Sequence, residues 1–267
     1  MWDSSVMSLA ALAALVPAAL LPFLRRPERP DLLYWLCLGV ALAGTTAVAM
    51  VELRGSWNAG FSTTLWLSIA TTIALFILIS AALRDFWRLA PLALPYLVLL
   101  GLLATIWVQA SVRQQALPPL DTWLRIHIVA ALVTYALATL AAVAGTAVFL
   151  QDRALKSKKT TRLSRLLPAL ADAERLEVLL LRWAVFILAA GLLTGMAVQY
   201  LNTKQLLVLD HKILFSFLAF AVLLLLLGLH QLTGLRGRLA VRLTLLVYLL
   251  LTLAFPGVKF IADVLVA

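Results

Sequence analysis

Eight long apolar segments occupy most of this 267-residue chain, and they constrain its fold more than any other feature. A helix needs roughly 20 consecutive apolar residues to cross the hydrocarbon core of a membrane. Only 13% of the residues are charged, against about a quarter in a soluble domain. The sequence therefore predicts an all-α integral membrane protein whose single domain, 1–267, is a bundle of eight transmembrane helices. We expect the spans at approximately 4–24, 32–51, 63–83, 92–110, 127–149, 181–200, 211–232 and 243–264.

The basic residues are unevenly distributed between the two sets of connecting segments. Of the 22 lysines and arginines, 16 lie in the connections after the first, third, fifth and seventh spans. Basic residues concentrate in the cytoplasmic connections of membrane proteins. We therefore expect an N-out/C-out protein of the bacterial inner membrane. This distribution and contact with anionic membrane lipids explain the net charge of +10, so that charge does not indicate a nucleic-acid partner.

The connection between the fifth and sixth spans, 151–180, is the longest one. It begins with a basic run from Arg153 to Arg165, and after Pro168 leucines recur at helical spacing among charged residues. One interpretation is an amphipathic helix that lies on the cytoplasmic surface of the membrane. The other interpretation is a simple helical extension of the sixth span.

Two of the three histidines stand at the start of a predicted span on the same side of the membrane. His127 opens the fifth span and His211 opens the seventh. Neutral imidazole is a good ligand for haem iron, and two imidazoles from different helices can fill both axial positions. The alternative is a pair of interfacial histidines that meet headgroups or water, because sequence spacing cannot show whether these two spans are neighbours.

Four further residues are weaker candidates for a binding site. His230 lies 19 residues after His211, which is about 28 Å along a helix, so it cannot share a site with the other two histidines. It is either a cytoplasmic-side ligand or an interfacial histidine. Thr134 and Tyr135 lie on a face of the fifth span that suits helix packing but could also hydrogen-bond a ligand. Trp123 belongs to an aromatic belt or contacts a flat macrocycle.

Several function classes lack their characteristic motifs in this sequence. There is no P-loop, no HExxH and no GxSxG. Cys37 is the only cysteine, which excludes an internal disulfide, a CxxC redox motif and a CxxCH haem-attachment motif. No predicted span contains an acidic residue at mid-depth, which argues against a proton-coupled pump.

Three stretches of the chain resemble a known family. They are Leu124 to Gly145 with its outer-face His127, Asp210 to Phe220 followed by His230, and Phe255 to Phe260. In these stretches the chain is similar to the integral membrane cytochrome c assembly proteins, the group that contains CcmC, CcsA and the HemX-like proteins. The similarity covers roughly the C-terminal half and, more weakly, the third span. The loop that contains Trp57 is similar to the HemX-like branch.

The resemblance implies a carrier or assembly factor that handles haem at the outer face, rather than a turnover enzyme. It implies haem b as cofactor, with His127 as the carried-over iron ligand, and it places His211 where the family has its haem loop or the helix start after it. His230 is similar to a family histidine near the inner end of that helix and is a weaker, cytoplasmic-side candidate. Tyr135 and Trp123 are candidate haem contacts from the residue pattern alone. It also implies other cytochrome c maturation or haem-synthesis proteins as partners.

Two alternatives to haem handling remain open. The first is a non-catalytic membrane scaffold subunit of a larger complex without haem. The absence of tryptophan from 199–210 favours it, because the family has a tryptophan-rich segment there. The second is a small-molecule or lipid transporter, although the spans lack charged or helix-breaking residues at mid-membrane.

Overall fold

The computed structural model describes residues 4–25, 29–52, 60–109, 122–204 and 210–261, and every regular element within these ranges is helical. The long helices are α1 (Ser4–Leu24), α2 (Leu32–Glu52), α3 (Phe61–Ala82), α4 (Ala90–Ile106), α5 (Thr122–Ser157), α7 (Leu170–Thr203), α8 (His211–Thr233) and α9 (Arg238–Thr252). The short elements are η1 (Phe86–Leu89), α6 (Arg162–Leu166), η2 (Leu253–Gly257) and α10 (Val258–Phe260). Eight helical segments are long and apolar enough to cross a membrane, which confirms the all-α fold and the expected number of spans.

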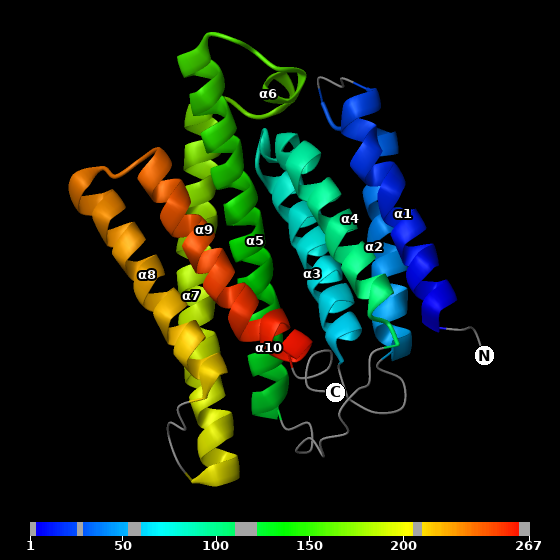
Figure 1. The fold of residues 1–267 in the computed structure, drawn as a ribbon, viewed down its shortest axis with the longest axis vertical. Coiled ribbons are helices and arrows are strands. Elements are labelled where there is room, and N and C mark those ends of the chain that lie inside the picture. The colour runs from blue at the N-terminus through cyan, green and yellow to red at the C-terminus, as the bar shows by residue number, and fades with distance from the viewer. Residues whose placement is uncertain (1–3, 26–28, 53–59, 110–121, 205–209, 262–267) are drawn as a thin grey trace.

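The long helices run alternately up and down, so that helices consecutive in the chain are antiparallel (Figure 1). One end of the bundle, which we call the His127 end, holds the starts of α1, α3, α5 and α8 together with α10. The opposite end, which we call the basic end, holds α6, the α3–α4 turn and the α8–α9 turn. The connections that carry most of the lysines and arginines thus share one end.

The helices pack as two groups of four. In the first group α1 contacts α2 and α4, and α3 contacts α2 and α4. In the second group α5 contacts α7 and α9, and α8 contacts the same two helices, so α5 and α8 stand opposite each other. Contact between α3 and α5 joins the groups. The second group contains every histidine of the chain.

The pair formed by α5 and α7 is the centre of the second group. Small side chains on α5, among them Ala138, Ala141 and Ala144, are buried against its neighbours and allow close approach of the helix backbones. Gly145 continues this face, and a Cβ added there would lie 2.8 Å from Oε1 of Glu177 on α7. Glycine at this position therefore leaves room for a buried carboxyl group.

Glu177 is a buried acidic residue inside a helix that is long enough to cross a membrane. Its side chain is 3% exposed, and its Oε1 accepts a hydrogen bond of 2.7 Å from the Thr244 hydroxyl of α9. It lies outside the span expected at 181–200 but inside α7, which begins at Leu170. Three helices, α5, α7 and α9, meet around this one carboxyl group.

The long connection predicted at 151–180 is mostly helical. It contains the last turns of α5, the short α6 and the first turns of α7. Because α7 is one helix from Leu170 to Thr203, the leucine-patterned segment is an extension of the sixth span, which was one of the two interpretations. The fifth span was expected to end too early, at 149, and the sixth to start too late, at 181, because charged residues flank helices that continue beyond their apolar stretches.

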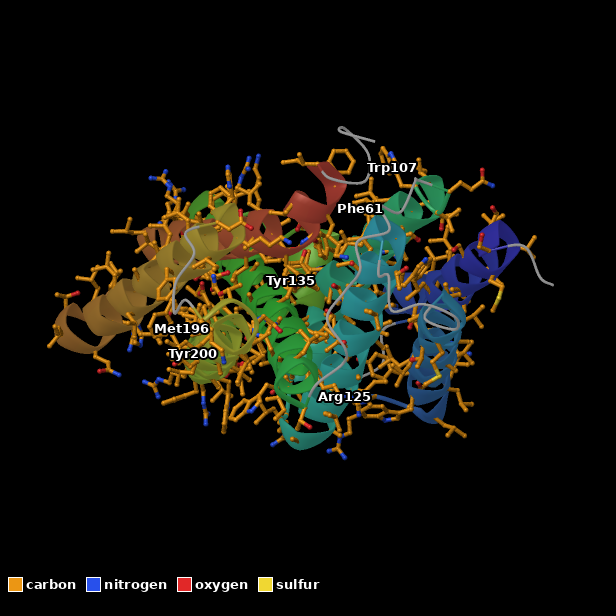
Figure 2. The ribbon with its side chains drawn as sticks, turned by 90° about the horizontal axis from the view of Figure 1, so that it is seen from below. Phe61, Trp107, Arg125, Tyr135, Met196 and Tyr200 are labelled. Atoms are coloured by element: carbon orange, nitrogen blue, oxygen red, sulfur yellow. The ribbon has the colours of Figure 1, made fainter. Side chains whose placement is uncertain are left out.

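The last described part of the chain changes its helical winding. Residues Leu253–Gly257 form a π-helical turn that contains Pro256 and leads into α10. At the His127 end, Phe260 of α10 packs edge-on against Phe61 of α3 and Trp107 beyond α4, with ring centroids 5.2 and 5.5 Å away. Figure 2 shows Phe61 and Trp107 close together at this end. This cluster links the end of the second helix group to the first.

Candidate ligand pocket at the His127 end

A cavity of about 300 Å³ lies inside the second helix group, among α5, α7, α8 and the π-helical turn. Its wall is mainly apolar, and the polar side chains that line it are few. These are His127, Thr134 and Tyr135 from α5, Gln199 from α7, and Lys212 and Ser216 from α8. An apolar cavity with a small number of placed polar groups is typical of a small-molecule or cofactor site. Seen from the His127 end, Tyr135 and Met196 of this region lie apart from Phe61 and Trp107 (Figure 2).

The imidazole of His127 is held by the backbone of α7. Its Nδ1 lies 2.9 Å from the carbonyl oxygen of Gly191, and the hydroxyl of Thr194 lies 3.5 Å from the same nitrogen. A carbonyl oxygen can only accept a hydrogen bond, so Nδ1 carries the proton in the neutral ring. The lone pair is then on Nε2. A hydrogen bond of this kind on the other ring nitrogen is the usual support of a metal-binding histidine.

Two glycines on α7 hold this imidazole in different ways. Gly191 supplies the accepting carbonyl, and Gly195 follows it by one turn. A Cβ added at Gly195 would lie 2.8 Å from Cε1 of His127 and 3.2 Å from Nδ1. Carbon atoms do not approach so closely without a shift, so a side chain at Gly195 would displace the ring. The position of His127 therefore depends on the backbone carbonyl of Gly191 and on the absence of a side chain at Gly195.

Thr134 adds an unsatisfied polar group to the wall of the cavity. The residue is 2% exposed, and its hydroxyl has no hydrogen-bond partner among the described residues. Other threonines of α5, such as Thr139 and Thr146, donate to the carbonyl four residues earlier. A buried hydroxyl without a partner costs free energy, so it marks a place where a ligand or a water molecule completes the structure.

Tyr135 closes the inner end of the cavity and belongs to a chain of three tyrosines. Its hydroxyl lies 3.1 Å from the hydroxyl of Tyr248 on α9, which in turn is hydrogen-bonded to the hydroxyl of Tyr96 on α4. The ring of Phe255, in the π-helical turn, lies 5.9 Å from the Tyr135 ring. The three hydroxyls satisfy one another inside the bundle, and they give the cavity a fixed polar end.

The other predicted site residues lie outside this cavity. His211 is the first residue of α8, and its side chain is 87% exposed and bonded through Nδ1 to Asp210 at 3.2 Å. Trp123 is 47% exposed in the first turn of α5. His230 lies at the basic end, where its Nδ1 donates to the Leu235 carbonyl at 2.9 Å. The structure thus brings His127 together with Thr134 and Tyr135, and it places His211 at the start of the helix opposite α5.

Sequence reasoning missed the residues of α7, α8 and the π-helical turn that complete the site. These are Gly191, Gly195, Gln199, Lys212 and Phe255. One signal was available, because two small residues four positions apart in a span indicate close helix packing, as Gly191 and Gly195 do here. That signal does not identify which helix packs against the two glycines. No comparable sequence pattern predicts the π-helical turn.

Comparison with known proteins identifies the family. Residues 31–266 match the family model described as Cytochrome C assembly protein, which extends the match beyond the C-terminal half and third span that carried the resemblance. A relative from Azospirillum brasilense, named "Uncharacterized 28.8 kDa protein in nifR3-like 5'region", is 46% identical over 269 residues, or 99% of each chain. No solved structure matches this chain. With its match over residues 31–266 and its eight candidate spans, the chain belongs to the cytochrome c assembly protein family and is a multi-pass membrane protein with a role in cytochrome c biogenesis.

Proposed function

We propose that this protein binds haem b in the cavity beside His127 and acts in cytochrome c biogenesis as a haem-handling assembly factor. The observation that carries the proposal is the hydrogen bond from Nδ1 of His127 to the Gly191 carbonyl. It leaves Nε2 as an unprotonated nitrogen, and such a nitrogen is the usual donor of a haem-ligating histidine. Haem bound there would supply an iron centre, with His127 as the residue that would hold it.

The residues around His127 fit the remaining chemistry of a porphyrin. The apolar wall suits the faces of the macrocycle, and the unpartnered Thr134 hydroxyl marks an incomplete polar contact. Lys212 and Gln199 line the same cavity and offer donors for the negatively charged propionates. The cavity of about 300 Å³ is at the small end of the range for ligand sites, which is roughly 300–1,000 Å³, so entry of a macrocycle would need the helices to separate.

His211 and Trp123 remain part of the proposal as partners outside the cavity wall. His211 directly precedes Lys212, which lines the cavity, so a change in the first turn of α8 would be needed to present its imidazole. Trp123 lies one turn before His127 on α5, where an aromatic side chain can cover the cavity mouth. His230 would serve at the basic end, separate from this site.

The setting of the proposed site follows from the charge pattern. The basic end of the bundle is expected in the cytoplasm, which puts the His127 end outside the bacterial inner membrane. Haem held there would be available to cytochrome c maturation proteins on the outer side, the partners that we propose. The HemX-like branch of the family remains our finer assignment. Its Trp57 loop lies outside the described residues.

A hemin titration of the detergent-purified protein tests the proposal. We expect the wild type to show a stoichiometric Soret band. The apparent affinity for hemin should fall at least about tenfold in His127→Ala, because the donor nitrogen is lost. His211→Ala should retain binding but shift the spectrum from low-spin to high-spin, because a second strong ligand is removed. His230→Ala, the same change at the basic end, is the control and should leave the titration unaltered.

Two results would contradict the proposal at different levels. Saturable binding that is equal in wild type and His127→Ala would remove the assigned ligand. The absence of any saturable hemin spectrum would favour the second candidate, a scaffold subunit without haem. That candidate is supported by the lack of tryptophan in 199–210 and by the exposed His211 side chain.

A further inference from the structure

A second cavity, of about 130 Å³, lies at the basic end among four separate segments of the chain. The end of α1, the start of α2, the η1–α4 region and α6 all contribute to its wall. Three arginines from three of these segments line it: Arg25 after α1, Arg88 in η1 and Arg165 in α6. Basic residues that serve only to orient a membrane protein need to lie near the ends of spans. Convergence on one cavity is a further property, which that role does not require.

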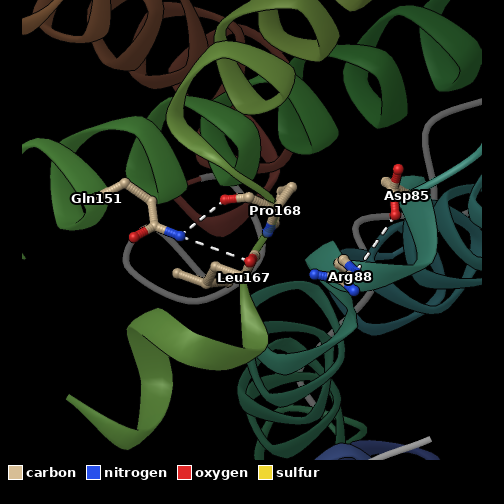
Figure 3. A network of polar contacts seen from close by, with 5 residues as sticks. All are labelled: Asp85, Arg88, Gln151, Leu167 and Pro168. Carbon is tan, nitrogen blue, oxygen red and sulfur yellow. Dashed lines mark hydrogen bonds and ion pairs between the residues drawn. The ribbon is translucent and has the colours of Figure 1, made fainter. Parts of the chain in front are cut away.

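The charges around this cavity leave an excess of one positive charge. Arg25 pairs with Asp31 at 3.7 Å, and Arg88 pairs with Asp85 at 3.3 Å (Figure 3 shows the second pair). Arg165 forms no ion pair with any acidic side chain among the described residues. Among the described residues, two of the three guanidinium groups that line the cavity are thus paired with a neighbouring carboxylate, and that of Arg165 is not, so one positive charge is left for an anion.

The short helix α6 is held in place so that Arg165 stays at the rim. A helix of five residues is not stable alone. Thr161 and Ser164 form a capping box, with hydrogen bonds of 3.1 and 2.9 Å between side chain and backbone. The amide of Gln151 on α5 donates to the carbonyl oxygens of Ser164 and Pro168, at 2.9 and 2.8 Å, and Figure 3 shows Gln151 reaching the Leu167–Pro168 segment.

A further contact fixes α6 against the end of α1. Arg162, three residues before Arg165, donates from Nη2 to the Phe23 carbonyl at 2.6 Å. Arg162 thus ties α6 to α1, and its neighbour Arg165 is free for a different role at the cavity. A connection held by this many contacts presents its basic side chain in a defined place, which an unstructured basic loop does not.

The rest of the wall is apolar and aromatic. Leu21, Pro22 and Leu166 supply aliphatic surface, and Trp87 and Tyr34 supply rings. The Arg88 guanidinium lies 5.6 Å from the centre of the Trp87 ring, and Tyr34 is 3% exposed. Guanidinium groups together with aromatic and aliphatic surface in one cavity match a molecule with an anionic phosphate and a hydrocarbon tail. Basic pockets between spans on the cytoplasmic side are known to hold such headgroups.

We propose that this cavity binds the phosphodiester group of an anionic phospholipid between Arg25, Arg88 and Arg165. The phosphodiester carries one negative charge, which matches the one lining guanidinium group, that of Arg165, that has no ion pair among the described residues. Arginine is suited to this contact because its planar fork binds phosphate oxygens in pairs. The bound lipid joins α1, α2, α4 and α6 at the basic end. This inference is independent of haem binding, because the two cavities share no residue.

Thermal unfolding of the full-length protein in mild detergent tests this site. Titration with phosphatidylglycerol should raise Tm in a saturable manner, whereas phosphatidylcholine and inorganic phosphate at matched concentrations should not. Arg165→Gln should weaken the apparent affinity for phosphatidylglycerol about fivefold, the effect of one basic residue on an anionic lipid. Lys159→Gln removes an equal charge from the same connection, outside the cavity, and should behave as wild type.

Three outcomes would overturn the proposal. An unchanged phosphatidylglycerol titration in Arg165→Gln would show that the lipid binds elsewhere. An equal loss in Lys159→Gln would show that only the total charge of the connection matters. A rise in Tm with inorganic phosphate alone, equal to that with phosphatidylglycerol, would assign the cavity to a free anion instead of a lipid. Because Arg165 is exposed, its substitution should leave the fold intact.

Discussion

Gly195→Ala is expected to weaken hemin binding by about tenfold to a hundredfold while the helices stay folded. The added methyl group would lie 2.8 Å from Cε1 of His127, so the imidazole must move away from the Gly191 carbonyl. Loss of an outer hydrogen bond of a metal ligand typically costs a factor of about 10–100 in affinity. The substitution leaves every donor atom of the cavity in the chain, so the effect would come from position alone.

Gly191→Ala is the matched control for this prediction. It makes the same change one turn earlier on α7, where the added Cβ would meet only the Ala130 Cβ at 3.6 Å, an ordinary contact. Both substitutions raise helix propensity equally, by about 1 kcal/mol, so that effect cancels between them. Hemin titrations of the two variants give the comparison. Equal affinities would show that the packing of His127 against Gly195 does not set the position of a ligand.

Gly145→Ala should lower Tm by several degrees, through the buried carboxyl group of Glu177. The new Cβ would lie 2.8 Å from Oε1 and 3.3 Å from Cδ of that side chain, which the Thr244 hydrogen bond holds in place. Forcing an extra methyl group into a packed interior costs about 1–3 kcal/mol. The gain in helix propensity, about 1 kcal/mol, offsets only part of this cost.

Thermal unfolding in detergent, followed by circular dichroism, measures the effect. Gly39→Ala is the control, because nothing lies within 4 Å of its added Cβ. The double variant Gly145→Ala/Glu177→Ala completes a mutant cycle with the single variant Glu177→Ala. If the contact is responsible, Gly145→Ala should cost much less in the Glu177→Ala background. A cost that is the same in both backgrounds would assign the destabilisation to another part of α5.

The sequence predicted the fold well because the membrane imposes one simple requirement on each span. A run of apolar residues long enough to cross the bilayer has almost no alternative to a helix, so each of the eight segments could be recognised separately. The end of α5 and the start of α7 could not be recognised in this way, because both helices continue through charged turns that a hydropathy pattern does not detect. Packing between α5 and α7 stabilises those turns, and this packing depends on how the surfaces of the two helices fit together.

The candidate site was only half predictable, for a related reason. The residues His127, Thr134 and Tyr135 share one helix face, and helical spacing shows this directly. Their partners lie on α7, α8 and the π-helical turn, and nothing in the spacing of the spans states which helices are adjacent. Pairing of His127 with His211 requires α5 and α8 to approach each other, which sequence spacing left open. In the structure α7 and α9 lie between them.

Glu177 illustrates what an amphipathic pattern can conceal. Its position among leucines and other charged residues was compatible with a surface helix, in which a carboxylate faces water, and equally with an extension of the sixth span. In the folded protein the carboxyl group enters a space left by Gly145 and is bonded to Thr244. The absence of a side chain at Gly145 on α5 thus leaves space for the acidic side chain of Glu177 on α7. This relation can be recognised only when the relative positions of the two helices are known.

The cavity beside His127 is built wholly from residues that follow position 126. Among the described residues, the polar link from the first four helices to it runs through Tyr96 to Tyr248 and Tyr135. Substitutions on α1 and α2, which pack mainly on each other and on α3 and α4, should therefore leave the shape and the chemistry of the cavity unaltered. The residues that line this cavity are thus confined to the second helix group, and a change of sequence in α1 or α2 can act on it only through the helices between.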